Sequence, residues 1–96
     1  MTSTLPTQEQ VDQIAKSLAP DVVRIRMRDG LDWADDPALY FYVILADDDF
    51  KRFHDVASTV RERLREDLGL LDLTHTFYMR FRSESEQRQL QEKLWD

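Results

Sequence analysis

The sequence contains no cysteine and, among its 96 residues, only two glycines. Without thiols the chain can form no disulfide, no thiolate metal site and no cysteine nucleophile. Loops that cradle phosphate groups need several closely spaced glycines, whereas Gly30 and Gly69 stand far apart. No serine has the flanking glycines of a nucleophile elbow. The sequence therefore lacks the common motifs of nucleotide-binding proteins and of serine and cysteine hydrolases.

Long apolar segments and an excess of positive charge are also missing. The longest apolar run, Ala38 to Ala46, is far shorter than the ~20 residues that cross a bilayer. Residues Met1 to Gln10 have neither the positive charge nor the apolar stretch of a secretory signal, so we expect a cytoplasmic protein. Thirteen basic and nineteen acidic side chains give a net charge of -6, which disfavours nucleic acid and anionic lipid as partners.

Neither the histidines nor the carboxylates form a recognisable catalytic or metal-binding pattern. His54 and His75 each lack a second imidazole three or four residues away. The carboxylates form two groups: Asp29, Asp32, Asp35 and Asp36, and then Asp47, Asp48 and Asp49. A strand of about nine residues would hold these groups about 30 Å apart, so they cannot share an ion. We expect them to stabilise loops and cap helices, and we expect no catalytic residue, metal or cofactor.

Three segments show the spacing of amphipathic helices. The expected capping residues are Thr7 with Gln10, one of Asp47, Asp48 and Asp49, and Ser83 with Glu86. Pro20 ends the first helix and Gly69 ends the second. The apolar stripe expected on the long second helix is Phe50, Phe53, Ala57, Val60, Leu64 and Leu68. The short final helix is expected to carry Leu90, Leu94 and Trp95.

Three other segments are typical of strands, and Gly30 should end the first of them. The expected strands are Val22 to Arg28, Leu39 to Leu45 and Thr76 to Arg82. The first and third alternate between apolar and polar residues, which indicates one buried face. The second is apolar throughout and rich in aromatic and branched residues, so it should be the central strand.

The order helix, strand, strand, helix, strand, helix predicts an α+β fold. The segment between the first two strands, which holds Trp33, is too short for a helix, so these strands should be antiparallel neighbours. The long helix then lets the third strand run parallel to the second. We expect a two-layer sandwich in which a three-stranded mixed sheet carries the first two helices on one face. Residues 1–96 should form a single domain, with residues 1–5 as a disordered tail.

The alternation in these strands predicts that the sheet face away from the two helices is rich in arginine and tyrosine. Its candidate contact residues are Arg24, Arg26, Arg28, Tyr40, Tyr42, Tyr78, Arg80 and Arg82. One interpretation is structural: the final helix covers the tyrosines, and Glu84, Glu86 and Glu92 neutralise arginines. A second is a protein interface with another chain or a second copy, since Tyr and Arg are enriched at interface hot spots. A third is single-stranded nucleic acid, with Tyr stacking on bases. Trp33 should fold back on the rim of the core; if exposed, it would be a binding anchor.

Two segments resemble a set of small bacterial proteins of uncharacterised function. They run from Asp32 to Ala38 (DWADDPA) and from Phe81 to Gln87 (FRSESEQ). These proteins are similar in element order to the minimal nucleotidyltransferases of toxin–antitoxin pairs. That resemblance implies a Gly-Ser turn and an Asp-x-Asp motif, but here Gly30 is followed by Leu31, and Tyr40, Tyr42 and Ile44 occupy the mid-strand positions. The nucleotide-binding and metal-binding residues are therefore not carried over.

These observations favour a non-catalytic protein–protein interaction module, such as an accessory or antitoxin-like subunit, that acts through the Arg/Tyr face. The first alternative is a divergent Mg²⁺-dependent nucleotidyltransferase that uses Asp47 to Asp49. The second alternative is a binder of single-stranded nucleic acid.

Overall fold

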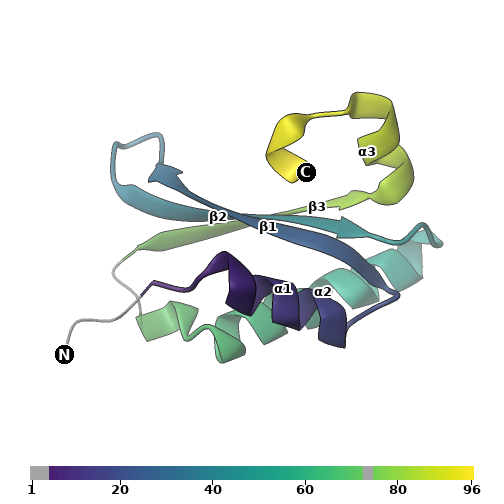
Figure 1. Cartoon of the computed structure of the whole chain (residues 1–96), viewed down its shortest axis with the longest axis horizontal. Coiled ribbons are helices and arrows are strands. Elements are labelled where there is room, and N and C mark those ends of the chain that lie inside the picture. The colour runs from purple at the N-terminus through teal and green to yellow at the C-terminus, as the bar shows by residue number, and fades with distance from the viewer. Residues whose placement is uncertain (1–4, 73–74) are drawn as a thin grey trace.

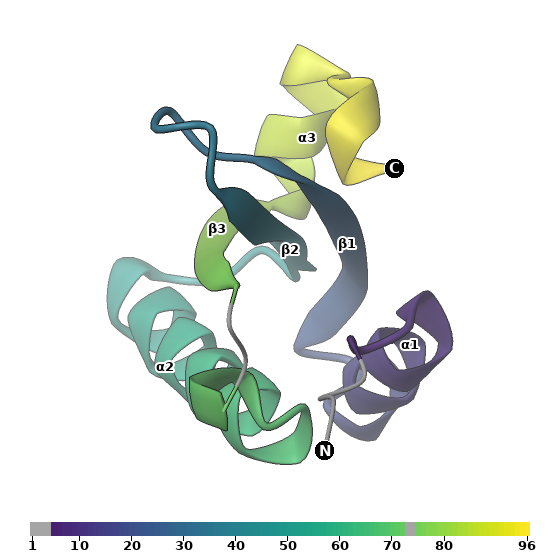
Figure 2. The same cartoon turned by 90° about the vertical axis from the view of Figure 1, so that its left-hand side faces the viewer.

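The computed structural model describes residues 5–72 and 75–96 as a three-stranded sheet between two groups of helices (Figure 1). In chain order the elements are α1 (Gln8–Ser17), β1 (Val22–Leu31), β2 (Pro37–Leu45), α2 (Phe50–Asp67), the 3₁₀ helix η1 (Leu70–Asp72), β3 (Thr76–Ser83), α3 (Glu84–Leu90) and the 3₁₀ helix η2 (Lys93–Trp95). The helices α1 and α2 lie on one face of the sheet, and α3 with η2 lies on the other (Figure 2). The predicted α+β class and element order are confirmed.

The sheet has the strand order β1-β2-β3, with β1 antiparallel and β3 parallel to β2. The central position of β2 explains its apolar composition, because both of its faces are covered and water can solvate neither. Its inward side chains, Leu39, Phe41, Val43 and Leu45, belong to the main core with Val11 and Ile14 of α1 and Val60 and Leu64 of α2. The predicted pairing of the strands is therefore confirmed, and so is their predicted phase from Arg24 onward in β1 and throughout β2 and β3.

The predicted helix caps are also confirmed. Thr7 and Ser83 each form a capping box, with Gln10 and with Glu86. Among the three aspartates after β2, Asp49 is the cap of α2, since its carboxylate accepts a hydrogen bond from the Arg52 amide at 2.8 Å. At the other end of α2, Gly69 has a φ of 60°, which an L side chain rarely adopts.

The first strand differs from the prediction at both of its ends. Gly30 does not end β1: it pairs with Ala38, and the strand continues to Leu31. A register irregularity between Val22 and Arg24 inserts one residue near the start of the strand. Because of this bulge, Val22 points into the core, and Val23, which was predicted to do so, is exposed.

Two other predictions are wrong. Phe50 is not part of the buried stripe of α2: it lies in the first turn, meets the His54 ring edge-on at 4.4 Å, and has 80% of its surface exposed. The final helix does not reach Trp95, since α3 ends at Leu90 and Gln91 adopts a left-handed conformation. Leu5, expected in a disordered tail, packs against the core. Residues 1–4 of that tail lie outside the described residues.

None of the helices in residues 5–72 and 75–96 is long and apolar enough to cross a bilayer.

Candidate interaction surface

The Arg/Tyr face consists of three rows of paired residues across the sheet. From the carboxyl end of β2 to its amino end, the rows are Arg24–Ile44–Arg82, Arg26–Tyr42–Arg80 and Arg28–Tyr40–Tyr78. Paired residues on neighbouring strands project to the same side of a sheet. All eight candidate contact residues therefore share one face, as predicted. The structure divides them between a covered end and an open end.

The covered end lies beneath Trp95, which is 4% exposed. Its ring meets Tyr42 edge-on at 5.1 Å, and together with Ile44 the three form a second, smaller core on this side of the sheet. The left-handed turn at Gln91 makes this possible, because it lets the chain reverse after α3 and place η2 across the strands. The predicted covering of the tyrosines is thus made by Trp95, whereas Leu90 and Leu94 remain about half exposed.

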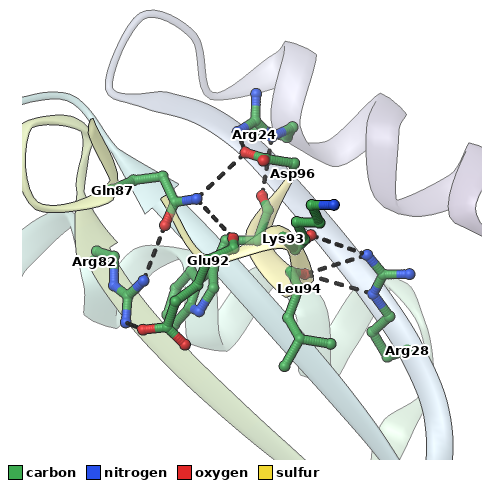
Figure 3. Close-up of polar contacts among 9 residues, drawn as sticks. Arg24, Arg28, Arg82, Gln87, Glu92, Lys93, Leu94 and Asp96 are labelled. Carbon is green, nitrogen blue, oxygen red and sulfur yellow. Dashed lines mark hydrogen bonds and ion pairs between the residues drawn. The ribbon is translucent and has the colours of Figure 1, made fainter. Parts of the chain in front are cut away.

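Hydrogen bonds fix the C-terminal segment over this second core (Figure 3). The Arg82 guanidinium lies 4.1 Å from the Trp95 ring centre and donates to Gln87 Oε1 at 2.9 Å and to Glu92 at 3.0 Å. Gln87 is buried, and its Nε2 donates to the Glu92 carbonyl at 2.8 Å and to Asp96 at 3.3 Å. Of the three glutamates predicted to neutralise arginines, Glu92 does so, while Glu86 serves in a capping box.

The arginines of β1 hold the same segment from the opposite edge. Arg24 donates from Nε to the Trp95 carbonyl at 3.1 Å and pairs with Asp96 at 3.1 Å. Arg28 donates more weakly to the carbonyls of Lys93 and Leu94 at 3.4–3.5 Å. Arg24, Tyr42 and Arg82 are therefore engaged within the protein itself, whereas Arg28 makes only these long contacts and its side chain stays exposed.

Arg26, between the other two arginines of β1, is half-buried. Its Nε is sealed from solvent and finds no acceptor among the described residues. Leaving a buried donor without a partner costs about 1–3 kcal/mol. Because the Arg26 side chain is half-buried, it offers less accessible surface to a partner than the exposed Arg28 and Arg80 do.

The open end of the face is built on a pair of tyrosines. The rings of Tyr40 and Tyr78 stack at 5.3 Å, and both are half-buried. The Tyr40 hydroxyl donates to the Leu31 carbonyl at 2.9 Å. Partial burial, with the nearby Asp32 carboxylate, raises the pKa of Tyr78, so its phenol stays protonated. Beside this pair, the side chains of Arg28 and Arg80 are exposed.

The loop between β1 and β2 rises beside the open end, on the same side of the sheet as α3 (Figures 1 and 2). Asp32 orders it: its Oδ1 accepts from the amides of Ala34 and Asp36 at 2.9 and 3.0 Å. The Tyr78 hydroxyl approaches the same carboxylate at 3.5 Å. Trp33 at the loop is 93% exposed, so the prediction that it folds back on the core is wrong. Trp33 stays outside the core because the Asp32 carboxylate closes the loop through its hydrogen bonds, without any contact from the indole.

We call the accessible group the open platform: Arg28, Trp33, Tyr40, Tyr78 and Arg80. Four of these were candidate contact residues, and Trp33 was singled out only in the case that it was exposed. Of the remaining candidates, Arg24, Tyr42 and Arg82 are held by the C-terminal segment and Arg26 is half-buried.

Three of the seven aspartates in the two acidic groups have structural roles of the kind predicted for them. Asp47 accepts hydrogen bonds from the hydroxyl and the amide of Ser85, and these lower the pKa of Asp47. Asp49 caps α2, and Asp32 closes the loop described above. No group of three or more potential metal ligands occurs in residues 5–72 and 75–96.

A pocket of about 560 Å³ lies between α3 and the start of β1. Its apolar lining residues are Ile44 and Val23, and its other lining residues include charges of both signs. The Arg24 guanidinium is already paired with Asp96. Because the charges that line this pocket are of both signs and Arg24 is already paired, the pocket favours neither an anionic nor a cationic ligand.

Comparisons of the chain with protein-family models, with curated proteins and with solved structures found no match.

Proposed function

We propose that this chain is a non-catalytic protein-binding module whose contact surface is the open platform. The observation that carries the proposal is Trp33, which is 93% exposed on a loop fixed by hydrogen bonds. Burying an indole upon association removes a large apolar area from water. A loop that is already ordered loses little conformational entropy when a partner binds. An exposed and pre-organised tryptophan has the properties of an interface hot spot.

The surroundings of Trp33 support a protein partner. The stacked pair Tyr40–Tyr78 supplies a rigid aromatic floor, and Arg28 and Arg80 supply charged groups at its side. Tyr, Trp and Arg are the residue types most enriched at hot spots. The same platform is flanked by the exposed carboxylates of Asp35 and Asp36, and the whole chain is acidic. This charge distribution disfavours a polyphosphate backbone and suits a partner with charges of both signs.

The residues of the central strand support a function without catalysis. The mid-strand positions where the resemblance to minimal nucleotidyltransferases implies carboxylates hold Tyr40, Tyr42 and Ile44. Tyr42 and Ile44 are buried beneath Trp95, and the nearby carboxylates of Asp96 and Glu92 are paired with Arg24 and Arg82. An accessory subunit that works by association is consistent with this arrangement.

Site-specific photo-crosslinking tests the proposal. A photoreactive phenylalanine analogue is introduced at Trp33 and, in a matched control, at Phe50, which is also strongly exposed but lies at the start of α2. Crosslinking in cells of the source organism should give a defined protein adduct at position 33 and none at position 50. The partner is then purified and its affinity measured. Trp33→Ala should weaken binding by about 30-fold, the effect of losing a hot spot of about 2 kcal/mol.

Equal labelling from both positions, or unchanged affinity of Trp33→Ala for the crosslinked protein, would overturn the proposal. A nucleic-acid partner would be recognised by retardation of single-stranded oligonucleotides at low salt that is abolished in Arg80→Glu. That result would replace the protein-binding function with the second alternative.

A further inference from the structure

The two edges of the sheet differ in how they are protected. Along the outer edge of β1, the Gln8 side chain from α1 acts as a substitute strand. Its Nε2 donates to the Ile25 carbonyl at 2.8 Å, and its Oε1 accepts from the Met27 amide at 2.9 Å. These bonds occupy the backbone groups with which another strand would pair.

The opposite edge, formed by β3, has no neighbouring strand in the part of the chain that the structure describes. β3 is eight residues long, and its register with β2 runs without interruption from Thr76 to Ser83. It has no proline, no lysine and no bulge, and its two charged side chains, Arg80 and Arg82, both lie on the Arg/Tyr face. Figure 2 shows β3 at the border of the sheet, with α2 beneath it. The backbone of β3 is therefore available to pair with an added strand.

A groove runs beside this edge on the α2 side. It has a volume of about 230 Å³ and is lined by Arg61, Arg65, Leu71, Phe77 and Met79. Phe77 and Met79 are only half-buried, and Leu71 is 71% exposed. The Arg61 guanidinium lies over the Phe81 ring at 5.2 Å. An apolar floor beside the free edge is thus flanked by two cationic side chains from α2.

We propose that β3 accepts an extended segment of a partner protein in which apolar and acidic residues alternate. Successive side chains of a strand point to opposite faces, so every second one would enter the groove and meet Phe77 and Met79. The intervening acidic side chains would lie on the opposite face, within reach of Arg80, whose side chain is exposed. Arg80 is an exposed cation on a chain whose net charge is -6. The edge interface shares Arg80 with the open platform but does not involve Trp33, and it extends the proposed function to a second binding mode.

The charge pattern also distinguishes this occupant from a second copy of the chain. Antiparallel pairing of β3 with itself would bring the Arg80 side chains of both copies to the same face of the joined sheet. Like charges at such short separations oppose association. An acidic segment instead makes an attractive contact with Arg80.

The probe is a blocked peptide of alternating glutamate and valine with the eight-residue length of β3. Titrated into ¹⁵N-labelled protein, it should shift the amide signals of Thr76–Ser83 and protect them from hydrogen exchange, leaving the edge of β1 unaffected. Arg80→Glu should weaken binding by about tenfold. The matched control, Lys51→Glu on α2, should bind as the wild type does. A peptide with lysine in place of glutamate should bind at least about tenfold more weakly.

Any of three results would overturn this inference. The first is binding of the lysine peptide as tightly as the glutamate peptide. The second is peptide-induced shifts located outside β3 and its groove, or none at millimolar peptide. The third is a sedimentation analysis that finds a dimer whose β3 amides are already protected, since a second copy would then occupy the edge.

Discussion

The guanidinium of Arg82 lies 4.1 Å from the centre of the Trp95 ring, on the face of the sheet opposite α1 and α2. The same indole meets Tyr42 edge-on at 5.1 Å. Trp95 is therefore held between an arginine of β3 and the central strand, and it is buried, whereas the neighbouring Leu94 is about half exposed. It decides how much of the Arg/Tyr face is open to a partner.

Trp95→Ala should lower the free energy of unfolding by about 3 kcal/mol, because it removes a buried indole and leaves Tyr42 and Ile44 without cover. Trp33→Ala removes the same side chain from a position that is 93% exposed, so its effect should stay within about 0.5 kcal/mol. Urea denaturation followed by far-UV circular dichroism compares the two. Similar losses in both variants would contradict this description of the second core.

The two glycines should respond to alanine in opposite ways. Gly69 has a φ of 60°, and an alanine there costs about 1 kcal/mol of strain. At Gly30, within β1, a new Cβ would lie 3.9 Å from Tyr40 Cε2, an ordinary contact, so alanine should be neutral or stabilise by up to about 1 kcal/mol. Thermal denaturation of both variants measures the difference. Gly30→Ala being the less stable variant would contradict the assigned backbone conformations.

Much of the fold could be predicted because its signals are local. Apolar alternation set the phase of the strands, and the capping boxes at Thr7 and Ser83 marked where two helices begin. The prediction failed for Val23, where a single bulged residue changed which side chain points inward. Periodicity alone does not reveal an inserted residue, because the alternation on either side of it remains intact.

The candidate surface could be located from the sequence but not divided into its open and covered ends. The division depends on Gln91, whose left-handed conformation has no strong sequence signal, since glycine and asparagine are the residues that usually adopt it. The protection of β1 by Gln8 was also missed. A glutamine in the first turn of a helix is common, and only the packing of α1 shows that its amide reaches the strand.

Gln8→Ala should lower the free energy of unfolding by about 1–2 kcal/mol, because it removes two hydrogen bonds to β1 and exposes the edge of the strand. Gln13→Ala, at an exposed position of the same helix, is the matched control and should change stability by less than about 0.5 kcal/mol. Hydrogen exchange adds a local readout, since the Met27 amide should lose its protection in Gln8→Ala. Retained protection there would show that the Gln8 side chain does not bind the strand.

The contact between Asp47 and Ser85 should make stability depend on pH in the acid range. Hydrogen bonds from Ser85, with a smaller contribution from Arg88, lower the pKa of Asp47 in the folded protein below its ordinary value of 3.8. A group whose pKa is lowered by folding stabilises the folded state above its unfolded pKa, and this stabilisation is lost as the pH falls through its folded pKa. The contribution of Asp47 should therefore be complete above about pH 5 and disappear progressively below about pH 4.

Replacement of the serine tests this linkage directly. Ser85→Ala removes the hydroxyl donor, so the pKa of Asp47, followed by the ¹³C shift of its carboxyl carbon, should rise toward 3.8. Asp47→Asn should lose less stability than the wild type upon acidification from about pH 5 to about pH 3, because it has no carboxylate to protonate at this position. Ser58→Ala, an exposed serine on α2, should leave the titration of Asp47 unchanged. An Asp47 pKa that is the same in Ser85→Ala and in the wild type would show that the carboxylate does not depend on the start of α3.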